Sequence, residues 1–479
     1  MSRKVFSFVL VLTLSAAGIL LSMNACGGGS STATGTAPTT PPPATSKIQH
    51  IVVIVQENRT PDNLFQDPVL MARGADIATS GVDSTGATIP LTPVDLDTNG
   101  PTPVSYDLDH SHAGFKTMCD FDPATGTCKM DSADLVSVFC IKGASNCPPP
   151  NPQFKYVKPS DVAPYFALAE QFTFGDRMFQ TNQGPSFPAH QFLISGTSAP
   201  SPGSNLFAAN NPVMAVMTED AGCIAPAAQT VAIIDPQGNL TKQYPCFEHQ
   251  TLTDLLNAKG ITWRYYANSA GSIWTAPNAI QHMCGPNVAP PNATACTGSD
   301  WVSNVVLKSA QVLSDISSNQ LQQVTWVIPD GLTSDHAVVT DGSGPSWVAS
   351  IVNAIGNSPY WSNTAIIITW DDWGGWYDHV SPKVINSYEY GFRVPLIVVS
   401  PYAKAKYISH TTHDFGSILK FIEGTFGLPS LGYADVAADD LSDCFDYNQT
   451  PLTFPMIPAH FTATHFLNEK RPPTAPDND

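Results

Sequence analysis

Four residues whose side chains offer oxygen atoms as metal ligands fall into two pairs, and each pair closely follows a run rich in β-branched residues. Glu57 and Asn58 form the first pair, and Asp371 and Asp372 form the second. Ligands of open α/β sheets bind beyond the carboxyl ends of the strands, so both pairs can meet there. Three acids without a cation would repel one another and raise their pKa values. The pairs predict a divalent-cation site, with Mg, Ca or Mn favoured by oxygen ligands and Zn or Fe as alternatives. Taken singly, each pair also fits a capped turn or a solvated loop.

A candidate nucleophile, Ser186, lies between these pairs in the sequence. Gly184, Pro185 and Pro188 flank it, and a helix-like run over residues 189–195 follows. Prolines restrict the backbone, and the start of a helix attracts anions. A serine at this position is also a common helix cap, so Ser186 has both a catalytic and a structural interpretation.

The segments that position these residues alternate between apolar strands and amphipathic helices. A continuous β-branched run is typical of a strand buried on both faces of a parallel sheet. The alternation predicts an α/β fold with a doubly wound, mostly parallel sheet. The predicted strands span residues 51–55, 261–266, 324–328, 365–369 and 394–399, and the predicted helices span residues 251–259, 346–355 and 417–423.

Two long segments lack this periodicity. Over about residues 81–159 and 200–245, Pro, Gly, Asn and Cys dominate, which predicts insertions pinned by disulfides over the edge of the sheet. Eight cysteines form sequence neighbours, and four short-range disulfides are the simplest pairing, although spacing alone does not fix the connectivity. The neighbours are Cys119 with Cys128, Cys140 with Cys147, Cys223 with Cys246, and Cys284 with Cys296, which leaves Cys444 over. No pair has the tight CxxC spacing that favours zinc.

Composition excludes several classes of protein. The 479 residues are 43% hydrophobic and 10% aromatic, enough to form a packed core over most of the length. The net charge of −18 gives no electrostatic footprint for binding a nucleic-acid backbone, so we expect no nucleic-acid partner.

The N-terminus has the pattern of an export signal. Arg3 and Lys4 precede an apolar run over residues 5–23, and we interpret residues 1–25 as a signal peptide. Cys26 stands where a lipoprotein carries its lipid, and residues 26–46 form a low-complexity tether. An ordinary cleaved signal or an uncleaved anchor are the alternatives. We expect an exported, lipid-anchored protein in the periplasm or at the cell surface, with one catalytic domain over residues 47–479.

Four blocks of the sequence resemble the bacterial phosphoesterase family, which includes phosphatidylcholine-type phospholipases C and secreted acid phosphatases. The blocks are residues 53–62 (VIVQENRTPD), the segment around Ser186, residues 369–380 (TWDDWGGWYDHV), and the stretch from residue 391 to 423. They occur in order within about residues 48–447. The resemblance implies an alkaline-phosphatase-like fold and a metal-assisted hydroxyl nucleophile.

The resemblance also implies roles for individual residues. Glu57, Asn58, Asp371 and Asp372 match the family's metal ligands, and Ser186 matches its nucleophile and remaining metal contact. The histidines that hold the phosphoryl oxygens correspond to His336, by its local sequence, and to His110 and His282, by order and approximate spacing. His112 is a rival to His110, and the role of His190 stays open. We expect His379 to support the loop, and His410 and His413 to be structural.

These features predict a metal-dependent phosphoesterase that hydrolyses phosphate monoesters through a phosphoserine intermediate. Ser186 stands where the phospholipase branch usually has Thr, and Asp372 where that branch commonly has Glu, which favours a phosphatase. A phospholipase C-type phosphodiesterase acting on phospholipid is the alternative. A metal-free serine hydrolase lacks its GxSxG elbow here, and a sulfatase lacks the arginine of its modification motif. A lipid-anchored binding protein without turnover is the alternative from another class.

Overall fold

The β-branched run after His50 forms the central strand of the sheet. In the computed structural model, which describes residues 47–214 and 219–475, strand β1 (His50–Gln56) pairs in parallel with β17 (Val324–Val327) on one side and β18 (Thr364–Trp370) on the other. Every residue of β18 is buried, as is all of β1 after His50. Burial on both faces explains why these strands are continuously apolar instead of alternating.

The main sheet has eight strands and is mostly parallel. Strand β19 is the exception, because it runs antiparallel to both of its neighbours. The observed strands confirm the α/β fold with a mostly parallel sheet that the sequence predicted. In spatial order they are β16 (Val305–Val306), β15 (Trp263–Tyr266), β17, β1, β18, β19 (Leu396–Val399), β10 (Thr173–Gly175) and β20 (Tyr407–Ser409).

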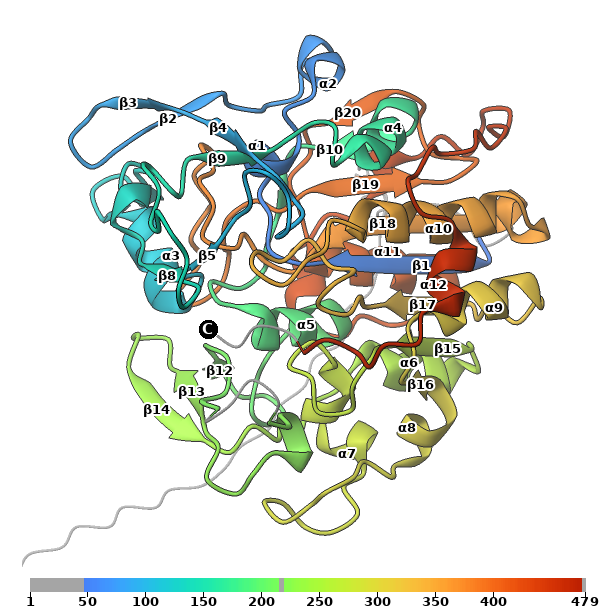
Figure 1. Cartoon of the computed structure of the whole chain (residues 1–479). Helices are drawn as coiled ribbons and strands as arrows, with labels where there is room; N and C mark the ends of the chain where they lie inside the picture. Colours follow the sequence, from blue (N-terminus) through green and yellow to red (C-terminus); the bar gives the residue numbers. More distant parts are fainter. Residues whose placement is uncertain (1–46, 215–218, 476–479) are drawn as a thin grey trace, which may run out of the picture. The chain divides into compact units, whose positions relative to one another are not determined.

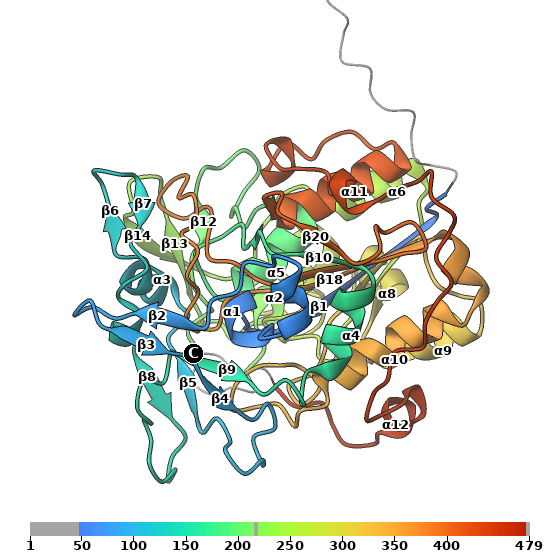
Figure 2. The same cartoon turned by 90° about the horizontal axis from the view of Figure 1, so that it is seen from above.

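Helices cover both faces of this sheet, as expected for a doubly wound fold (Figures 1 and 2). One group packs together on one face: α4 (Ala163–Gln171), α9 (Gln311–Ser317), α10 (Gly344–Gly356) and α12 (Ala463–Asn468). The group on the other face comprises α5 (Ser186–Ser195), α6 (Leu252–Lys259) and α11 (Phe415–Phe426). The remaining helices are short: α1 (Pro61–Leu64), α2 (Pro68–Ala72), α7 (Gln281–Cys284) and α8 (Ser299–Asn304).

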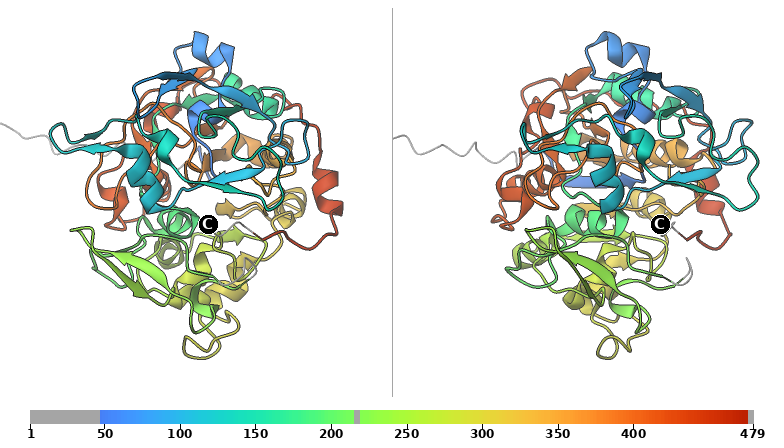
Figure 3. Two further views of the ribbon diagram at one scale, coloured as in Figure 1. Left: turned by 60° about the vertical axis from the view of Figure 1, so that its left-hand side comes forward. Right: turned by 90° about the vertical axis from the view of Figure 1, so that its left-hand side faces the viewer.

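The two irregular segments form small sheets outside the main one (Figure 3). The first contains α3 (His112–Cys119) and the strands β2 (Ser80–Val82), β3 (Thr88–Pro90), β4 (Thr92–Val94), β5 (Tyr106–Leu108), β6 (Phe121–Asp122), β7 (Thr127–Cys128), β8 (Val138–Cys140) and β9 (Lys155–Val157). The second contains a three-stranded sheet of β12 (Phe207–Ala208), β13 (Val231–Ile234) and β14 (Leu240–Gln243). One further pair joins β11 (Met178–Phe179) to β21 (His413–Asp414).

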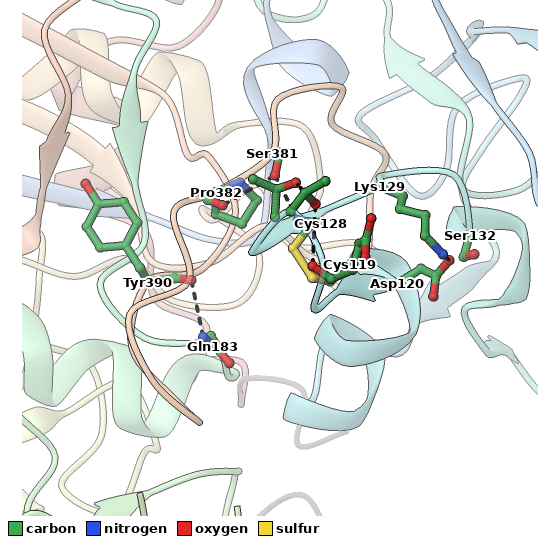
Figure 4. Close-up of a disulfide and its surroundings, with 12 residues drawn as sticks. Cys119, Asp120, Cys128, Lys129, Ser132, Gln183, Ser381, Pro382 and Tyr390 are labelled. Carbon is green, nitrogen blue, oxygen red and sulfur yellow. Dashed lines mark hydrogen bonds and ion pairs between the residues drawn. A yellow bond between two sulfur atoms is a disulfide. The ribbon is translucent and has the colours of Figure 1, made fainter.

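Four disulfides form, with the pairing that neighbouring cysteines predicted. Two lie in the first segment, Cys223–Cys246 closes the second, and Cys284–Cys296 joins the end of α7 to the loop before α8. Figure 4 shows the bond between Cys119 and Cys128, which joins the end of α3 to strand β7. The backbone N–H of Cys128 donates to Ser381 Oγ at 3.0 Å. The disulfide closes this part of the first segment on itself, and the hydrogen bond ties it to the loop that follows β18.

The predicted signal peptide, the lipidation site Cys26 and the tether lie outside the residues that the structure describes. Among the described residues, no helix is long and apolar enough to cross a bilayer.

Candidate active site and metal centre

The two pairs of oxygen ligands lie side by side because β1 and β18 are in register. Gln56 pairs with Trp370, so the next residue of each strand, Glu57 or Asp371, leaves the sheet at the same level. The backbone N–H of Asn58 donates to Asp371 Oδ1 at 3.1 Å, and the turn continues alongside the second segment. The sheet thus brings together the residues that the sequence predicted as metal ligands.

Two backbone features allow this close approach. Asn58 has a φ of +61°, in the left-handed region that Asn tolerates better than most side chains. Gly374 has a φ of +63°, and a Cβ at this position would lie 2.5 Å from the carbonyl oxygen of Asn58. Its N–H donates to Asp372 Oδ1 at 2.7 Å. A glycine is therefore required where the loop after β18 meets the turn after β1.

The electrostatics of the cluster favour a bound cation. Burial raises the pKa of Glu57 well above its ordinary value, and the neighbouring charges of Asp371 and Asp372 raise it further. Three buried oxygens of this cluster have no hydrogen-bond partner, namely Glu57 Oε2, Asn58 Oδ1 and Asp371 Oδ2. Buried polar atoms are normally satisfied, so unpartnered oxygens beside repelling carboxylates fit the coordination of a divalent ion.

His190, whose role the sequence left open, contacts this cluster. Its Nε2 lies 3.1 Å from Glu57 Oε1 and 3.7 Å from Asp371 Oδ2. Burial lowers the pKa of His190 to about 4, so the imidazole is neutral at pH 7. The spacing of four residues could have indicated this, because Ser186 and His190 are one helical turn apart and lie on the same face of α5.

Ser186 is the first residue of helix α5, which is buried along its whole length. Its hydroxyl donates to Asp372 Oδ2 at 3.4 Å. The positive end of the helix dipole therefore lies beside a hydroxyl that contacts a candidate metal ligand. This placement combines a candidate nucleophile with an environment that favours a phosphate group.

His110 contacts the cluster from the first irregular segment. Its Nδ1 lies 2.8 Å from the carbonyl oxygen of Leu108, so this nitrogen carries the proton, and Asn58 Nδ2 lies 3.1 Å from its Nε2. His110 thereby turns the Asn58 oxygen towards the other ligands. Gly375 makes this possible, because a Cβ there would lie 2.4 Å from the Cβ of Leu108. His112 instead bonds the carbonyl oxygen of Gln183 through Nδ1 at 2.9 Å.

His336 lies next to His110, with ring centroids 5.8 Å apart. Its Nδ1 donates to the carbonyl oxygen of Ala337 at 2.7 Å, and its ring lies 6.1 Å from that of Trp274. The preceding Asp335 accepts from Tyr165 and Trp370, and burial raises its pKa to about 6 although Arg59 opposes this. Asp335 therefore fixes the segment that carries His336.

His282 lies elsewhere. It is partly exposed on α7, with Nδ1 2.7 Å from Glu248 Oε1 and Nε2 3.3 Å from Asp254 Oδ1. Although burial opposes its charge, these carboxylates raise the pKa of His282 to about 9. The structure thus places His282 in an ion-pair cluster at the surface, and none of its hydrogen bonds or ion pairs joins it to the other predicted site residues.

A buried ion-pair network supports the loop after β18. Arg393 donates from Nε and Nη2 to both oxygens of Asp378 at 2.8 and 2.9 Å, and from Nη2 to Asp62 at 3.1 Å. His379 lies between Asp62 and Asp76, at 2.7 and 2.9 Å. This arrangement agrees with the supporting role expected for His379.

Comparison with known proteins identifies the class. The sequence model of the Phosphoesterase family matches residues 48–429, and the chain belongs to this family. The main sheet and the ligand cluster fall within the matched range.

The curated relatives are phospholipases C. A non-hemolytic phospholipase C of Pseudomonas aeruginosa is 27% identical over 63% of this chain and 45% of its own length. Phospholipase C A of Mycobacterium tuberculosis is 24% identical over 84% of this chain and 78% of its own length. The chain therefore spans less than half the length of the Pseudomonas relatives. A solved Vibrio parahaemolyticus protein of the alkaline phosphatase superfamily is 12% identical, with a TM-score of 0.32 over 60% of this chain and 67% of that one.

Proposed function

We propose that this protein hydrolyses phosphate monoesters, with Ser186 as the nucleophile and a divalent cation held by Glu57, Asn58, Ser186, Asp371 and Asp372. The observation that carries the proposal is the position of Ser186. Its hydroxyl lies at the start of a buried helix, 3.4 Å from Asp372. That carboxylate belongs to a cluster with three unpartnered buried oxygens.

The residues of the cluster fit a cation with oxygen ligands. Mg, Ca or Mn suits the carboxylates and the amide, and the neutral imidazole of His190 extends the choice to Zn or Fe. When bound, such an ion favours the ionised hydroxyl of Ser186 and offsets the negative charge of the phosphoryl group.

The chain's own residues supply the rest of the reaction. Ser186 Oγ attacks phosphorus in line with the leaving oxygen, forming one P–O bond as the other breaks, and gives a phosphoserine. His336 is the candidate that protonates the leaving alkoxide, and water then cleaves the phosphoserine to release phosphate. General acid catalysis supplies only about 10²- to 10⁴-fold, so positioning and charge stabilisation must supply most of the acceleration.

A phospholipase C-type diesterase is the second candidate. A cavity of about 280 Å³ is lined by Trp274, Asp220 and Asp330, among others. Trp274 also contacts the ring of His336. An aromatic ring with carboxylates suits the cationic head group of a phosphodiester, which a phospholipase C leaves on phosphorus when the other alcohol departs, and the curated relatives are named phospholipases C. The small volume suits such a head group better than a complete phospholipid.

The test compares three substrates: p-nitrophenyl phosphate, p-nitrophenyl phosphorylcholine and phosphatidylcholine. Each is assayed with added divalent metals and with EDTA, for wild type, Ser186→Ala and the control Ser195→Ala at the other end of α5. We expect the monoester to react fastest, EDTA to abolish turnover, and Ser186→Ala to lose at least about 10³-fold. Faster turnover of either diester would favour the phospholipase. No turnover by metal-loaded wild type would favour the binding protein, and full activity of Ser186→Ala would refute the nucleophile.

We also propose export and lipid anchoring through Cys26. The signal pattern and the tether support it. A Cys26→Ser variant should appear in the soluble fraction while wild type stays with membranes. Membrane association of both proteins would contradict the lipid anchor.

A further inference from the structure

We propose that His413, Asp443 and Cys444 form a second metal site, which takes a zinc-class transition metal and shares no residue with the candidate active site. The three lie where strand β21 meets the 3₁₀ turn Ser442–Cys444, at the end of the sheet that carries β20. Their ligand atoms all lie within 4.8 Å of one another. Of the cysteines that the structure describes, Cys444 alone is outside a disulfide.

The distances between the ligand atoms fit tetrahedral coordination. The three ligand atoms form a triangle. His413 Nε2 lies 3.3 Å from Asp443 Oδ1, Asp443 Oδ1 lies 3.5 Å from Cys444 Sγ, and Cys444 Sγ lies 3.9 Å from His413 Nε2. Zinc bonds of about 2.0 Å to nitrogen and oxygen and about 2.3 Å to sulfur give separations of roughly 3.3 Å between nitrogen and oxygen and roughly 3.5 Å from either to sulfur at tetrahedral angles. Two sides of the triangle already match, and the third needs a small rotation of either side chain.

The surrounding residues orient the ligands. Asp439 Oδ1 lies 2.8 Å from His413 Nδ1, the carboxylate–histidine arrangement that commonly backs a metal-bound imidazole. Ser409 donates to Asp443 Oδ2, and Thr411 Oγ1 donates to the same oxygen at 3.0 Å. The bonds to Oδ2 hold the carboxylate so that Oδ1 faces the histidine and the cysteine. Ser409 Oγ also lies 3.1 Å from His413 Nε2, and it must move aside when a metal binds.

The cluster is open on one side. His413 and Cys444 are buried, whereas the side chains of Asp443 and Asp439 are 23% and 27% exposed. A metal can therefore reach the cluster past the carboxylates, and water can fill the fourth position. Two carboxylates and a thiol that ionises on binding supply the charge that a divalent cation needs.

A metal-free ion pair is the competing interpretation. Burial opposes a charged His413, but Asp439 and Asp443 raise its pKa to about 11, so an imidazolium between two carboxylates is stable without metal. In this interpretation the Cys444 thiol keeps its proton and donates a hydrogen bond to Asp443 Oδ1 at 3.5 Å. The two interpretations differ in one measurable property, namely whether a thiolate contacts a metal.

Cobalt(II) distinguishes them, because a cobalt–thiolate bond gives an intense near-ultraviolet absorption that oxygen and nitrogen ligands do not give. The full chain is stripped with a chelator and titrated with Co²⁺, as wild type, Asp371→Asn, Cys444→Ala and Asp443→Asn. We expect the band in wild type and in Asp371→Asn, its loss in Cys444→Ala, and at least about 10-fold weaker binding in Asp443→Asn. A missing band in folded wild type, or a band that survives Cys444→Ala, overturns the proposal.

A second measurement covers the case in which Cys444→Ala does not fold. Zn²⁺ should raise the melting temperature of Asp371→Asn, which keeps only the second site intact, because a ligand that binds the native state alone stabilises it. The same addition should leave Asp371→Asn combined with Asp443→Asn unshifted, since Asp443 is partly exposed and its loss is tolerated. Equal shifts in the two proteins would overturn the site. Neither result depends on whether Ser186 is a nucleophile.

Discussion

His190 Nε2 and Glu57 Oε1 lie 3.1 Å apart in the interior of the protein, and both side chains are fully buried. Because burial lowers the pKa of His190 to about 4, the pair at pH 7 is a neutral imidazole beside a carboxyl group. The imidazole can donate one hydrogen bond to Oε1 and leave Oε2 directed towards a cation, or it can itself supply a nitrogen ligand. In either case His190 determines how Glu57 is presented.

Replacing His190 should therefore weaken metal binding. We expect His190→Gln to raise the metal concentration needed for half-maximal activation by about 10- to 100-fold. His249→Gln is a matched control, because His249 is also buried but bonds the carbonyl oxygen of Ala199. An unchanged activation constant in His190→Gln would show that this imidazole does not act on the metal site.

Glu57→Gln should stabilise the metal-free protein while it abolishes activity. The folded-state pKa of Glu57 is raised, so wild type loses stability as pH rises above the carboxyl group's ordinary value of about 4.5. The uncharged amide avoids that loss. In EDTA at pH 7, we expect the free energy of unfolding of the variant to exceed that of wild type by about 1–3 kcal/mol. At pH 4 we expect the two free energies of unfolding to be nearly equal. Urea unfolding at both pH values measures the difference, and a variant less stable at pH 7 would contradict it.

Replacing His336 and replacing His282 should affect activity differently, because the two histidines lie in different parts of the structure. We expect His336→Ala to lower kcat by about 10²- to 10⁴-fold, as the loss of a general acid would. His282→Ala should stay within about threefold of wild type, because its bonds go to Glu248 and Asp254 at the surface. Comparable losses in both variants would mean that the region around α7 moves towards the site during turnover.

His379 should make stability depend on pH in the alkaline range. Burial opposes its charge, but Asp62 and Asp378 raise its pKa to about 9 in the folded state, against an ordinary value of 6.5. The contribution is fully present below pH 6.5 and is lost as pH rises through 9. We expect wild type to lose about 2 kcal/mol between pH 6 and pH 9.5, relative to His379→Gln, after allowance for partial solvation. Parallel stability curves would argue against a charged His379.

Arg393 should be essential for stability. Its guanidinium is fully buried between Asp378 and Asp62, and removing one partner of a buried ion pair leaves an uncompensated charge. We expect Arg393→Met to cost about 3–5 kcal/mol of unfolding free energy. Arg177→Met is the control, because its pair with Asp76 is partly exposed and should cost about 1 kcal/mol or less. Similar losses would mean that burial does not distinguish the two pairs.

The central strands and the ligand pairs could be predicted because continuous β-branched runs have few other structures available. The five candidate ligands were expected just after those strands and at one helix start, and the family resemblance supplied their individual roles. His282 could not be placed in this way, because its orientation depends on Glu248 and on Asp254 of α6, which the spacing along the chain does not reveal. His413 was expected to be structural, since its neighbours Asp443 and Cys444 follow about 30 residues later and reach it only through the fold.

The register of β1 against β18 has a consequence for how this sequence can change. Side chains alternate between the two faces of a strand, so a change of one residue in the length of β18 would turn Asp371 away from Glu57. A deletion would put Asp372 in its place, and an insertion would put Trp370 there. Loops on the outer segments tolerate such length changes. The two central strands do not, and a viable descendant of this protein must keep their lengths even where it replaces most of their side chains.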